Sequence, residues 1–487
     1  MRTDIIFGPP GTGKTTALLG EVEAALAAGT DPARIAYFAF TRKAATEAAE
    51  RATQRFDFTE EDFVWFRTLH SAAFHILGLS TESVMQQHHY NEMAQALGYT
   101  FAHSYDESVE RVPVEGALGD RCLYHYSMAR ATMVPLAEAW RRFRMVDTPW
   151  VHVDRFAKTL DAYKKSNMLM DFTDFLDEVQ DPLHLELLIV DEAQDLTKQQ
   201  WAFVRRIGAY ANRVIIAGDD DQAIFEWAGA DIRTFLALRG NVKILPVSYR
   251  LPKTIWSFAN TIAQGIRTRR PKEWKDNGNA GAIQHLDEPE QANLKQGEWL
   301  MLCRNKYQLA QLARTCRDQG VVYKHNGKWS NQTRAVRAVV AYEALRAGKA
   351  VPTRRANMVT KYIPGLDAVL GTGGEATWAM FAWPFEGRPD WMSALSALGD
   401  EDREYIRKLR REGESLAHPG RVALSTIHSI KGGEADNVLL LTDVSKRVFE
   451  ESTRKPDAEA RVWYVGTSRA KRTLHIVRPH GQRFFLG

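Results

Sequence analysis

Residues 5–19, with the sequence IIFGPPGTGKTTALL, decide the fold of the first part of the chain. The apolar run at 5–7 predicts a buried strand, residues 8–15 a loop, and the residues from Thr16 onward a helix. Glycines between them let backbone N–H groups turn toward phosphates, while Lys14 can reach the β and γ phosphates and Thr15 can bind Mg²⁺. The segment predicts a P-loop for a nucleoside triphosphate, with a structural glycine turn as the alternative. Its predicted nucleotide-binding residues are Gly8, Gly11, Thr12, Gly13, Lys14, Thr15 and Thr16.

A second apolar run, LLIV at 187–190, ends in the acidic sequence DEAQD. Such a run is typical of a buried strand in a parallel sheet, and α/β proteins bind ligands at the carboxyl ends of these strands. Asp191 is predicted to bind Mg²⁺, and Glu192 is predicted to accept a proton from an attacking water. Two exposed acids at the end of a strand are the alternative.

A third apolar run, at 213–217, is followed by GDDDQAIFEW at 218–227. At a strand end, Gln222 can contact both the γ-phosphate and the attacking water. Three successive aspartates near phosphate are costly unless a metal ion or arginine side chains offset their charge. An acidic turn followed by a core tryptophan is the alternative.

The order of these motifs resembles that of the UvrD/Rep-type helicases of superfamily 1. Six further segments carry the resemblance, and they follow the order of the family's motifs. They are AFTRKAA at 39–45, TLHS at 68–71, LMDF at 169–172, VSYR at 247–250, STIHSIKGGE at 425–434 and WYVGTSRA at 463–470.

The resemblance implies an α/β fold with two RecA-like parallel-sheet P-loop NTPase domains, each interrupted by a mainly helical accessory insertion. ATP and Mg²⁺ would bind in the cleft between the two domains. The implied boundaries are 1–80 and 156–245 for the first domain, 81–155 for its insertion, 246–330 and 416–487 for the second domain, and 331–415 for its insertion.

The resemblance also implies the roles of residues around the nucleotide. The second domain would supply Arg250 and Arg469 as arginine fingers, which are typically worth about 10³ to 10⁵ in rate. Surface salt bridges are the alternative for these arginines. Tyr249 would stack on the adenine, and Glu434 would bind the ribose. The implied catalytic residues are Lys14, Glu192, Gln222, Arg250 and Arg469.

Residues that match the family's DNA track are aromatic or polar. Phe40, Phe225 and Trp227 would stack on single-stranded bases, which tolerates any base sequence. Core packing is the alternative for each of these rings. The remaining implied DNA-binding residues are Thr41, Arg42, His70, Thr426 and His428.

The function implied by the resemblance is that of an ATP-dependent DNA helicase or translocase in DNA repair or replication. It would move 3′ to 5′ on single-stranded DNA and act at junctions of single-stranded and double-stranded DNA. One alternative is an ATP-gated single-stranded nucleic-acid-binding regulator, or a translocase without unwinding activity. An RNA substrate also stays open. A helicase–nuclease is not expected, because the chain ends at Gly487 soon after the last motif.

Three features depart from the family pattern. Only Met1 to Asp4 precede the first strand, so the usual glutamine-bearing adenine reader is missing and weaker discrimination of ATP from other NTPs is expected. Leu69 stands where relatives often have Phe, and Ala228 stands where they often have Arg. Loss of that guanidinium removes a phosphate contact, so weaker binding of the single strand is expected.

Composition fits a globular protein of several domains, with 487 residues, 45% hydrophobic and 25% charged. Three scattered cysteines and the lack of a long apolar run predict a cytoplasmic protein without a membrane partner. The net charge of +4 does not by itself indicate a nucleic-acid partner. Basic residues cluster at 141–144, 267–275 and 407–411, and a solvated helix face is the alternative for each cluster.

Overall fold

The computed structural model describes residues 2–39, 42–53, 58–102, 116–143, 148–366, 373–381 and 385–485. Contacts between residues divide the chain into two compact units. The first consists of Met1–Arg250, Ala263–Asn277 and Asp457–Val462, and the second of Leu251–Ile262, Gly278–Pro456 and Trp463–Gly487. The residues at 246–250 and 263–277 therefore lie in the first unit, although the sequence prediction places them in the second domain.

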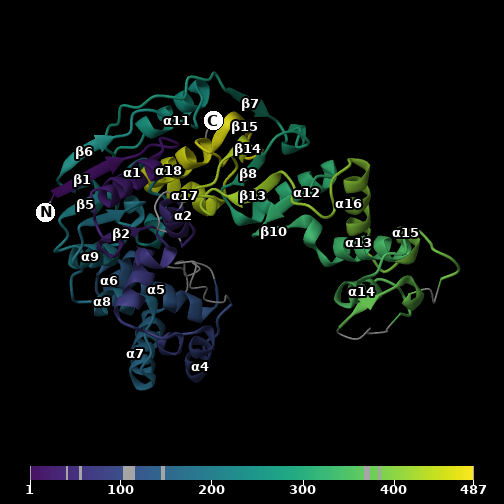
Figure 1. The fold of residues 1–487 in the computed structure, drawn as a ribbon, viewed down its shortest axis with the longest axis horizontal. Coiled ribbons are helices and arrows are strands. Elements are labelled where there is room, and N and C mark those ends of the chain that lie inside the picture. Colours follow the sequence, from purple (N-terminus) through teal and green to yellow (C-terminus); the bar gives the residue numbers. More distant parts are fainter. Residues whose placement is uncertain are drawn as a thin grey trace. The chain divides into compact units, whose positions relative to one another are not determined.

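A six-stranded parallel sheet forms the centre of the first unit (Figure 1). In spatial order its strands are β3 (Trp65–Arg67), β2 (Ile35–Phe38), β4 (Leu187–Val190), β5 (Arg213–Gly218), β1 (Arg2–Phe7) and β6 (Asn241–Ile244). Because β4, β5 and β1 are neighbours and run in the same direction, the loops that follow them meet at one edge of the sheet.

Helices cover both faces of this sheet. Side chains alternate along its strands, so the buried strands present apolar side chains on both faces. Phe7 and Ile5 of β1 pack in one apolar core, whereas Ile6 between them packs in another. The helices of the first core are α3 (Leu69–Ile76), α8 (Phe172–Glu178), α9 (Lys198–Ile207) and α10 (Ile232–Leu236), and those of the second core are α1 (Lys14–Ala27) and α2 (Arg42–Thr53).

A helical insertion follows α3 in the first unit. Its helices are α4 (Gln87–Leu97), α5 (Leu118–Thr132), α6 (Leu136–Arg142) and α7 (Trp150–Asn167). The predicted end of this insertion at 155 falls inside α7. Val153, Phe156 and Leu160 project from one face of α7 into the core that the insertion helices share, so the whole helix belongs with the insertion.

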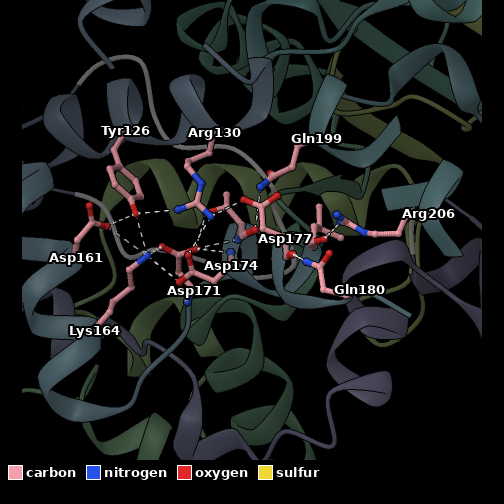
Figure 2. Close-up of polar contacts among 12 residues, drawn as sticks. Tyr126, Arg130, Asp161, Lys164, Asp171, Asp174, Asp177, Gln180, Gln199 and Arg206 are labelled. Atoms are coloured by element: carbon pink, nitrogen blue, oxygen red, sulfur yellow. Dashed lines mark hydrogen bonds and ion pairs between the residues drawn. The ribbon is translucent and has the colours of Figure 1, made fainter. Parts of the chain in front are cut away.

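A buried ionic network joins the insertion to α8 (Figure 2). Lys164 of α7 donates hydrogen bonds to Tyr126 Oη at 2.9 Å and to Asp171 Oδ2 and Asp174 Oδ2 at 2.7 Å each. Arg130 of α5 pairs with Asp174 at 3.1 Å and with a second carboxylate of α8, Asp177, at 2.7 Å. The insertion is thus fixed to an element of the sheet domain through charged groups and not only through apolar packing.

A seven-stranded sheet forms the centre of the second unit (Figure 1). In spatial order its strands are β10 (Lys328–Trp329), β9 (Tyr323–His325), β13 (Val422–Thr426), β8 (Trp299–Cys303), β14 (Ala435–Leu441), β15 (Ala470–Val477) and β7 (Ala282–Leu286). All neighbours pair in parallel except β9 and β10. The helices α12 (Leu309–Gln319) and α17 (Lys446–Arg454) also belong to this unit, whereas α11 (Lys253–Gln264) and α18 (Pro456–Thr467) contribute residues to both units.

A second insertion interrupts this sheet between β10 and β13. It contains α13 (Arg334–Arg346), α14 (Thr353–Thr360), α15 (Trp391–Ala394), α16 (Asp400–Arg411) and the short pair β11 (Val351–Pro352) and β12 (Glu375–Ala376). Ile406 of α16 packs in the insertion core, whereas Tyr405 and Leu409 pack in the core of the sheet. The helix α16 therefore connects the two cores of the second unit.

The prediction of an α/β fold with two parallel-sheet domains, each carrying a mainly helical insertion, is confirmed. Among the residues that the structure describes, no helix has the length and apolar character needed to cross a membrane.

Candidate nucleotide-binding site

The P-loop connects β1 to α1 through glycines in the left-handed region. Gly11 has φ 72° and Gly13 has φ 75°, conformations in which glycine is favoured. Within the described chain no side chain caps the amino end of α1, so its first-turn N–H groups are open to an anion. Thr15 and Thr16 lie on this first turn, and Thr12 Oγ1 donates to the Pro9 carbonyl at 2.8 Å. The loop has the donor set that a phosphate group requires.

Lys14 lies against the acids that follow β4. Its Nζ atom is 2.9 Å from Asp191 Oδ1 and also pairs with Glu192 Oε1. Burial alone would lower the pKa of Lys14, but the two carboxylates outweigh burial and raise this pKa above its ordinary value. The structure thus brings three predicted site residues together from the ends of β1 and β4, the two strands that flank β5.

Asp191 and Glu192 are held by their own backbone and by β2. Tyr37 donates from Oη to Asp191 Oδ2 at 3.1 Å, and the Glu192 N–H donates to Asp191 Oδ1 at 2.7 Å. Glu192 has φ 54°, a left-handed conformation that costs about 1 kcal/mol or more in a residue other than glycine. This turn points the Glu192 carboxylate back toward Lys14.

Gln194 is a site residue that the sequence prediction missed. It is fully buried, donates from Nε2 to Glu192 Oε2 at 2.7 Å, and accepts the Asp219 N–H on Oε1 at 3.0 Å. A Cβ atom on Gly218 would lie only 2.4 Å from Gln194 Oε1, so a larger residue there would displace this amide. The position of this amide among the acids of DEAQD was the available signal. Its partner Asp219 directly follows β5, and that proximity depends on the order of strands in the sheet.

Gln222 lies on the loop after β5, where it donates from Nε2 to Asp219 Oδ2 at 2.8 Å. Asp219, Asp220 and Asp221 are all buried, and Lys272 and Arg269 pair with them. The sequence indicated that a metal ion or arginine would have to offset these acids; Arg269 does so at Asp221, whereas the group that pairs with all three is a lysine, which was not predicted. The interpretation of the basic cluster at 267–275 as a solvated helix face is wrong for Lys272, because this side chain is 0% exposed.

The segment VSYR packs on the P-loop within the first unit. Ser248 Oγ donates to the Pro10 carbonyl at 2.8 Å, and the Tyr249 N–H donates to the Gly11 carbonyl at 2.7 Å. The Tyr249 side chain is 78% exposed and so is available to a flat ligand beside the loop. Arg250 lies next to Gly11, where a Cβ atom on the glycine would be 2.3 Å from Arg250 Cβ. The structure corrects one expectation, because Arg250 belongs to the first unit and not to the second.

The remaining predicted nucleotide residues lie in the second unit. Arg469 follows α18, is 2% exposed, and donates from Nε to the Val465 carbonyl at 2.9 Å. Glu434 precedes β14 and is exposed, with one carboxylate oxygen 3.7 Å from Lys471 Nζ. Arg469 lies between the carboxyl end of α18 and the amino end of β15, and Glu434 lies at the amino end of β14.

Predicted DNA-track residues occur in both units. In the first unit His70 of α3 lies edge-on to Phe172, with ring centroids 5.9 Å apart. Trp227 is half-buried, whereas Phe225 is only 3% exposed, so stacking by Phe225 requires its ring to be uncovered and stays a prediction.

In the second unit Thr426 ends β13 and donates to Ser429 Oγ at 2.9 Å, and His428 follows in the same turn and is half-buried. Phe40, Thr41 and the Arg42 side chain lie outside the described residues.

Comparison with protein families finds two matching family models. Residues 2–243 match the UvrD/REP helicase N-terminal domain, and residues 405–479 match the UvrD-like helicase C-terminal domain. Both matches keep the order in which these domains were expected.

Curated relatives include the protein named ATP-dependent DNA helicase PcrA of Staphylococcus aureus (strain Mu50), which is 23% identical over 345 residues. This match covers 66% of the chain and 46% of the relative. The protein named ATP-dependent DNA helicase PcrA of Bacillus subtilis (strain 168) is 24% identical over 308 residues. This match covers 56% of the chain and 39% of the relative. The chain spans about half the length of the curated relatives that it matches. A solved structure titled "The structure of PRRSV helicase" has a TM-score of 0.35 and 11% identity, covering 100% of this chain and 55% of that chain.

Proposed function

Because this chain belongs to the UvrD/Rep helicase family, we propose that it is an ATP-dependent DNA helicase that moves along single-stranded DNA. The names of its PcrA relatives support this activity. We expect movement from 3′ to 5′ and engagement at junctions of single-stranded and double-stranded DNA. These finer features come from the family resemblance.

The observation that supports the proposal most directly is the meeting of chemical groups at the ends of β1, β4 and β5. Lys14 pairs with Asp191 and Glu192. Gln222 is connected to Glu192 by hydrogen bonds through Asp219 and Gln194. A cation, two carboxylates and an amide in one place are the groups that phosphoryl transfer to water requires.

Nucleotide binding would use the open N–H groups of α1 and the exposed Tyr249 ring. On binding, Lys14 would exchange its carboxylate partners for the β and γ phosphates. Thr15 and Asp191 offer the oxygen ligands that suit Mg²⁺, which neutralises phosphate charge when bound. Glu434 would contact the ribose.

In hydrolysis, Glu192 would accept the proton of the attacking water while Gln222 orients that water. Arg250 and Arg469 would stabilise the charge that spreads over the γ-phosphate oxygens. Because Arg250 lies beside the P-loop in the first unit and Arg469 belongs to the second, the benefit from Arg469 would depend on opening and closing of the two units during the ATP cycle.

Grip on DNA would combine stacking with phosphate contacts. Trp227, Phe225 and Phe40 would stack on bases, each contact being worth roughly 1–3 kcal/mol. His70, Thr41, Arg42, Thr426 and His428 would lie along the backbone of the strand.

The test combines two assays on the purified chain. ATP hydrolysis is measured with and without single-stranded DNA, and unwinding is measured on duplexes with a 3′ or a 5′ tail. The proposal predicts DNA-stimulated hydrolysis and unwinding of the 3′-tailed duplex. Stimulated hydrolysis without unwinding would indicate a translocase, and stimulation by RNA alone would contradict the DNA substrate.

A variant of the general base sharpens this test. Glu192→Gln is expected to keep ATP and DNA binding while turnover falls by about 10²-fold to 10⁴-fold, the usual contribution of a general base. Glu186→Gln is a matched control, because Glu186 directly precedes the amino end of the same strand, β4, and pairs with Arg34 at the surface. Normal hydrolysis in Glu192→Gln would refute the assignment of the base.

A further inference from the structure

We propose that Lys272 is a positioning residue for Gln222 and that it acts through Asp219. The inference deepens the proposed function, because it explains how an amide assigned to the attacking water is held in place.

The three aspartates after β5 surround one ammonium group. Lys272 Nζ lies 3.1 Å from Asp219 Oδ1 and 2.7 Å from Asp221 Oδ2, and it also pairs with Asp220. All four side chains are at most 1% exposed. Three carboxylates whose oxygens converge in this way could hold a metal ion. The lysine supplies the positive charge at that position instead.

Arginines from two distant segments of the first unit add further positive charge. Arg269 forms a bidentate pair with Asp221, with contacts of 2.8 and 2.6 Å. Arg461 donates to the Asp220 carbonyl at 3.0 Å and pairs with Glu226 at 2.7 Å. Three cations thus face four carboxylates, which leaves a formal charge of −1, so the loss of any one cation would leave further buried charge uncompensated.

Asp219 connects the Lys272 ammonium group to the predicted catalytic residue Gln222. Its Oδ1 atom faces Lys272, while its Oδ2 atom accepts the hydrogen bond of the Gln222 amide at 2.8 Å. Its backbone N–H donates to Gln194, which in turn holds Glu192. Without the ammonium group, repulsion from Asp220 and Asp221 would turn the Asp219 carboxylate away, and Gln222 would lose its acceptor.

The first experiment measures Gln222 directly and needs no turnover. In protein labelled with ¹⁵N-glutamine, the side-chain signal of Gln222 is assigned by its loss in Gln222→Ala. The proposal predicts that Lys272→Met speeds hydrogen exchange of this amide by at least about tenfold. Lys164→Met is the matched control, because Lys164 is also buried among aspartates but shares none of these partners. Unchanged exchange in Lys272→Met would overturn the proposal.

The second experiment is a double-mutant cycle on ATP hydrolysis. Lys272→Met is expected to lower kcat by at least about tenfold with KM for ATP within about threefold, because Gln222 acts on the attacking water. In the Gln222→Ala background the same change should lower kcat by less than about twofold, whereas Lys164→Met should be additive. Additivity of Lys272→Met with Gln222→Ala would overturn the proposal.

Failure of the proposed function and failure of the proposed role of Lys272 give different results. A wild-type chain that does not hydrolyse ATP would defeat the proposed function, and the exchange measurement would still decide the role of Lys272. If Lys272→Met does not fold, Arg269→Gln removes one partner at the 13% exposed rim of the same cluster. Unchanged Gln222 exchange in that variant would count against the proposal.

Discussion

At the residue scale, the site depends on backbone conformations that few residues adopt. Gly11 and Gly13 take positive φ values in the P-loop, and Glu192 takes one although it carries a side chain. The glycines leave room for the segment that carries Tyr249 and Arg250. Local backbone geometry therefore places both the phosphate-binding loop and the proposed general base.

Gly11→Ala is expected to damage both stability and nucleotide binding. The new Cβ atom would lie 2.3 Å from Arg250 Cβ and 2.9 Å from Ser248 Oγ, in a residue with φ 72°. Overpacking together with a left-handed alanine should lower the free energy of unfolding by about 2 to 4 kcal/mol. Urea unfolding and titration with a fluorescent ATP analogue would measure the two effects.

Gly20→Ala provides the matched control for this substitution. Gly20 lies within α1, and a Cβ atom there would meet no other atom within 4 Å. This change should raise the free energy of unfolding by about 0.5 to 1 kcal/mol, because alanine favours helix more than glycine does. Equal effects of the two substitutions would contradict the packing of VSYR on the P-loop.

Much of the site could be predicted from local sequence at this scale. The P-loop and the acids after β4 lie next to the apolar runs that place them, so Lys14, Asp191 and Glu192 could be named as candidates without any knowledge of packing, and the structure brings these three side chains together. Lys272 was not found, because a lysine in a basic run is usually solvated and its three partners are about fifty residues away. Such a burial is decided by tertiary structure.

At the scale of elements, the network around Lys164 shows how the first insertion is attached. Lys164 comes from α7, its carboxylate partners Asp171 and Asp174 lie at the start of α8, and Arg130 comes from α5 (Figure 2). In turn, Gln199 of α9 donates from Nε2 to the Thr173 carbonyl of α8 at 2.9 Å. The short helix α8 is therefore held between the insertion and the sheet domain.

Lys164→Met is expected to lower the free energy of unfolding of the first unit by about 3 to 5 kcal/mol, since it removes the cation that pairs with the buried carboxylate of Asp171 and one of the two that pair with Asp174. Lys158→Met, on the exposed side of the same helix, removes only a surface pair with Asp154 and should cost less than about 1 kcal/mol. Denaturant unfolding of the two variants measures the difference. A small effect at Lys164 would contradict the buried network.

His125 of α5 gives the first unit a dependence on pH. Its side chain is 0% exposed, neither ring nitrogen has a hydrogen-bond partner within the described chain, and burial lowers the pKa of His125 to about 4. Its ordinary value is 6.5. The neutral ring is therefore favoured in the fold, so its stabilising contribution is complete above about pH 6.5 and is lost as the pH falls toward 4.

Acidification from about pH 7.5 to about pH 5 should lower the unfolding free energy of the wild type by about 1 to 2 kcal/mol more than that of His125→Leu. Denaturant unfolding at the two pH values measures this double difference. An identical loss in both proteins would show that His125 is protonated equally in the folded and unfolded chain.

Elements were predicted better than their boundaries. Apolar runs at 5–7, 187–190 and 213–217 all form strands of one parallel sheet. The boundary at 155 failed, because α7 is one continuous helix whose apolar face packs on the insertion. Phe225 illustrates the same difficulty, since the sequence does not reveal whether an aromatic ring lies in a core or faces a ligand.

At the scale of the whole molecule, binding of single-stranded DNA is expected to depend strongly on salt. With about five phosphates neutralised, affinity should fall about a hundredfold between about 50 and about 200 mM salt. Fluorescence anisotropy with a labelled oligonucleotide across this range measures the slope. An affinity that stays constant would contradict a track built on phosphate contacts.

The central claim is that Lys14 of the first unit and Arg469 of the second act on the same triphosphate. DNA-stimulated ATP turnover of Arg469→Lys tests it most directly, because lysine keeps the charge but loses the planar guanidinium. We predict that kcat falls by about 10³-fold or more while nucleotide affinity stays within about threefold of the wild type. Wild-type turnover in Arg469→Lys would contradict the claim.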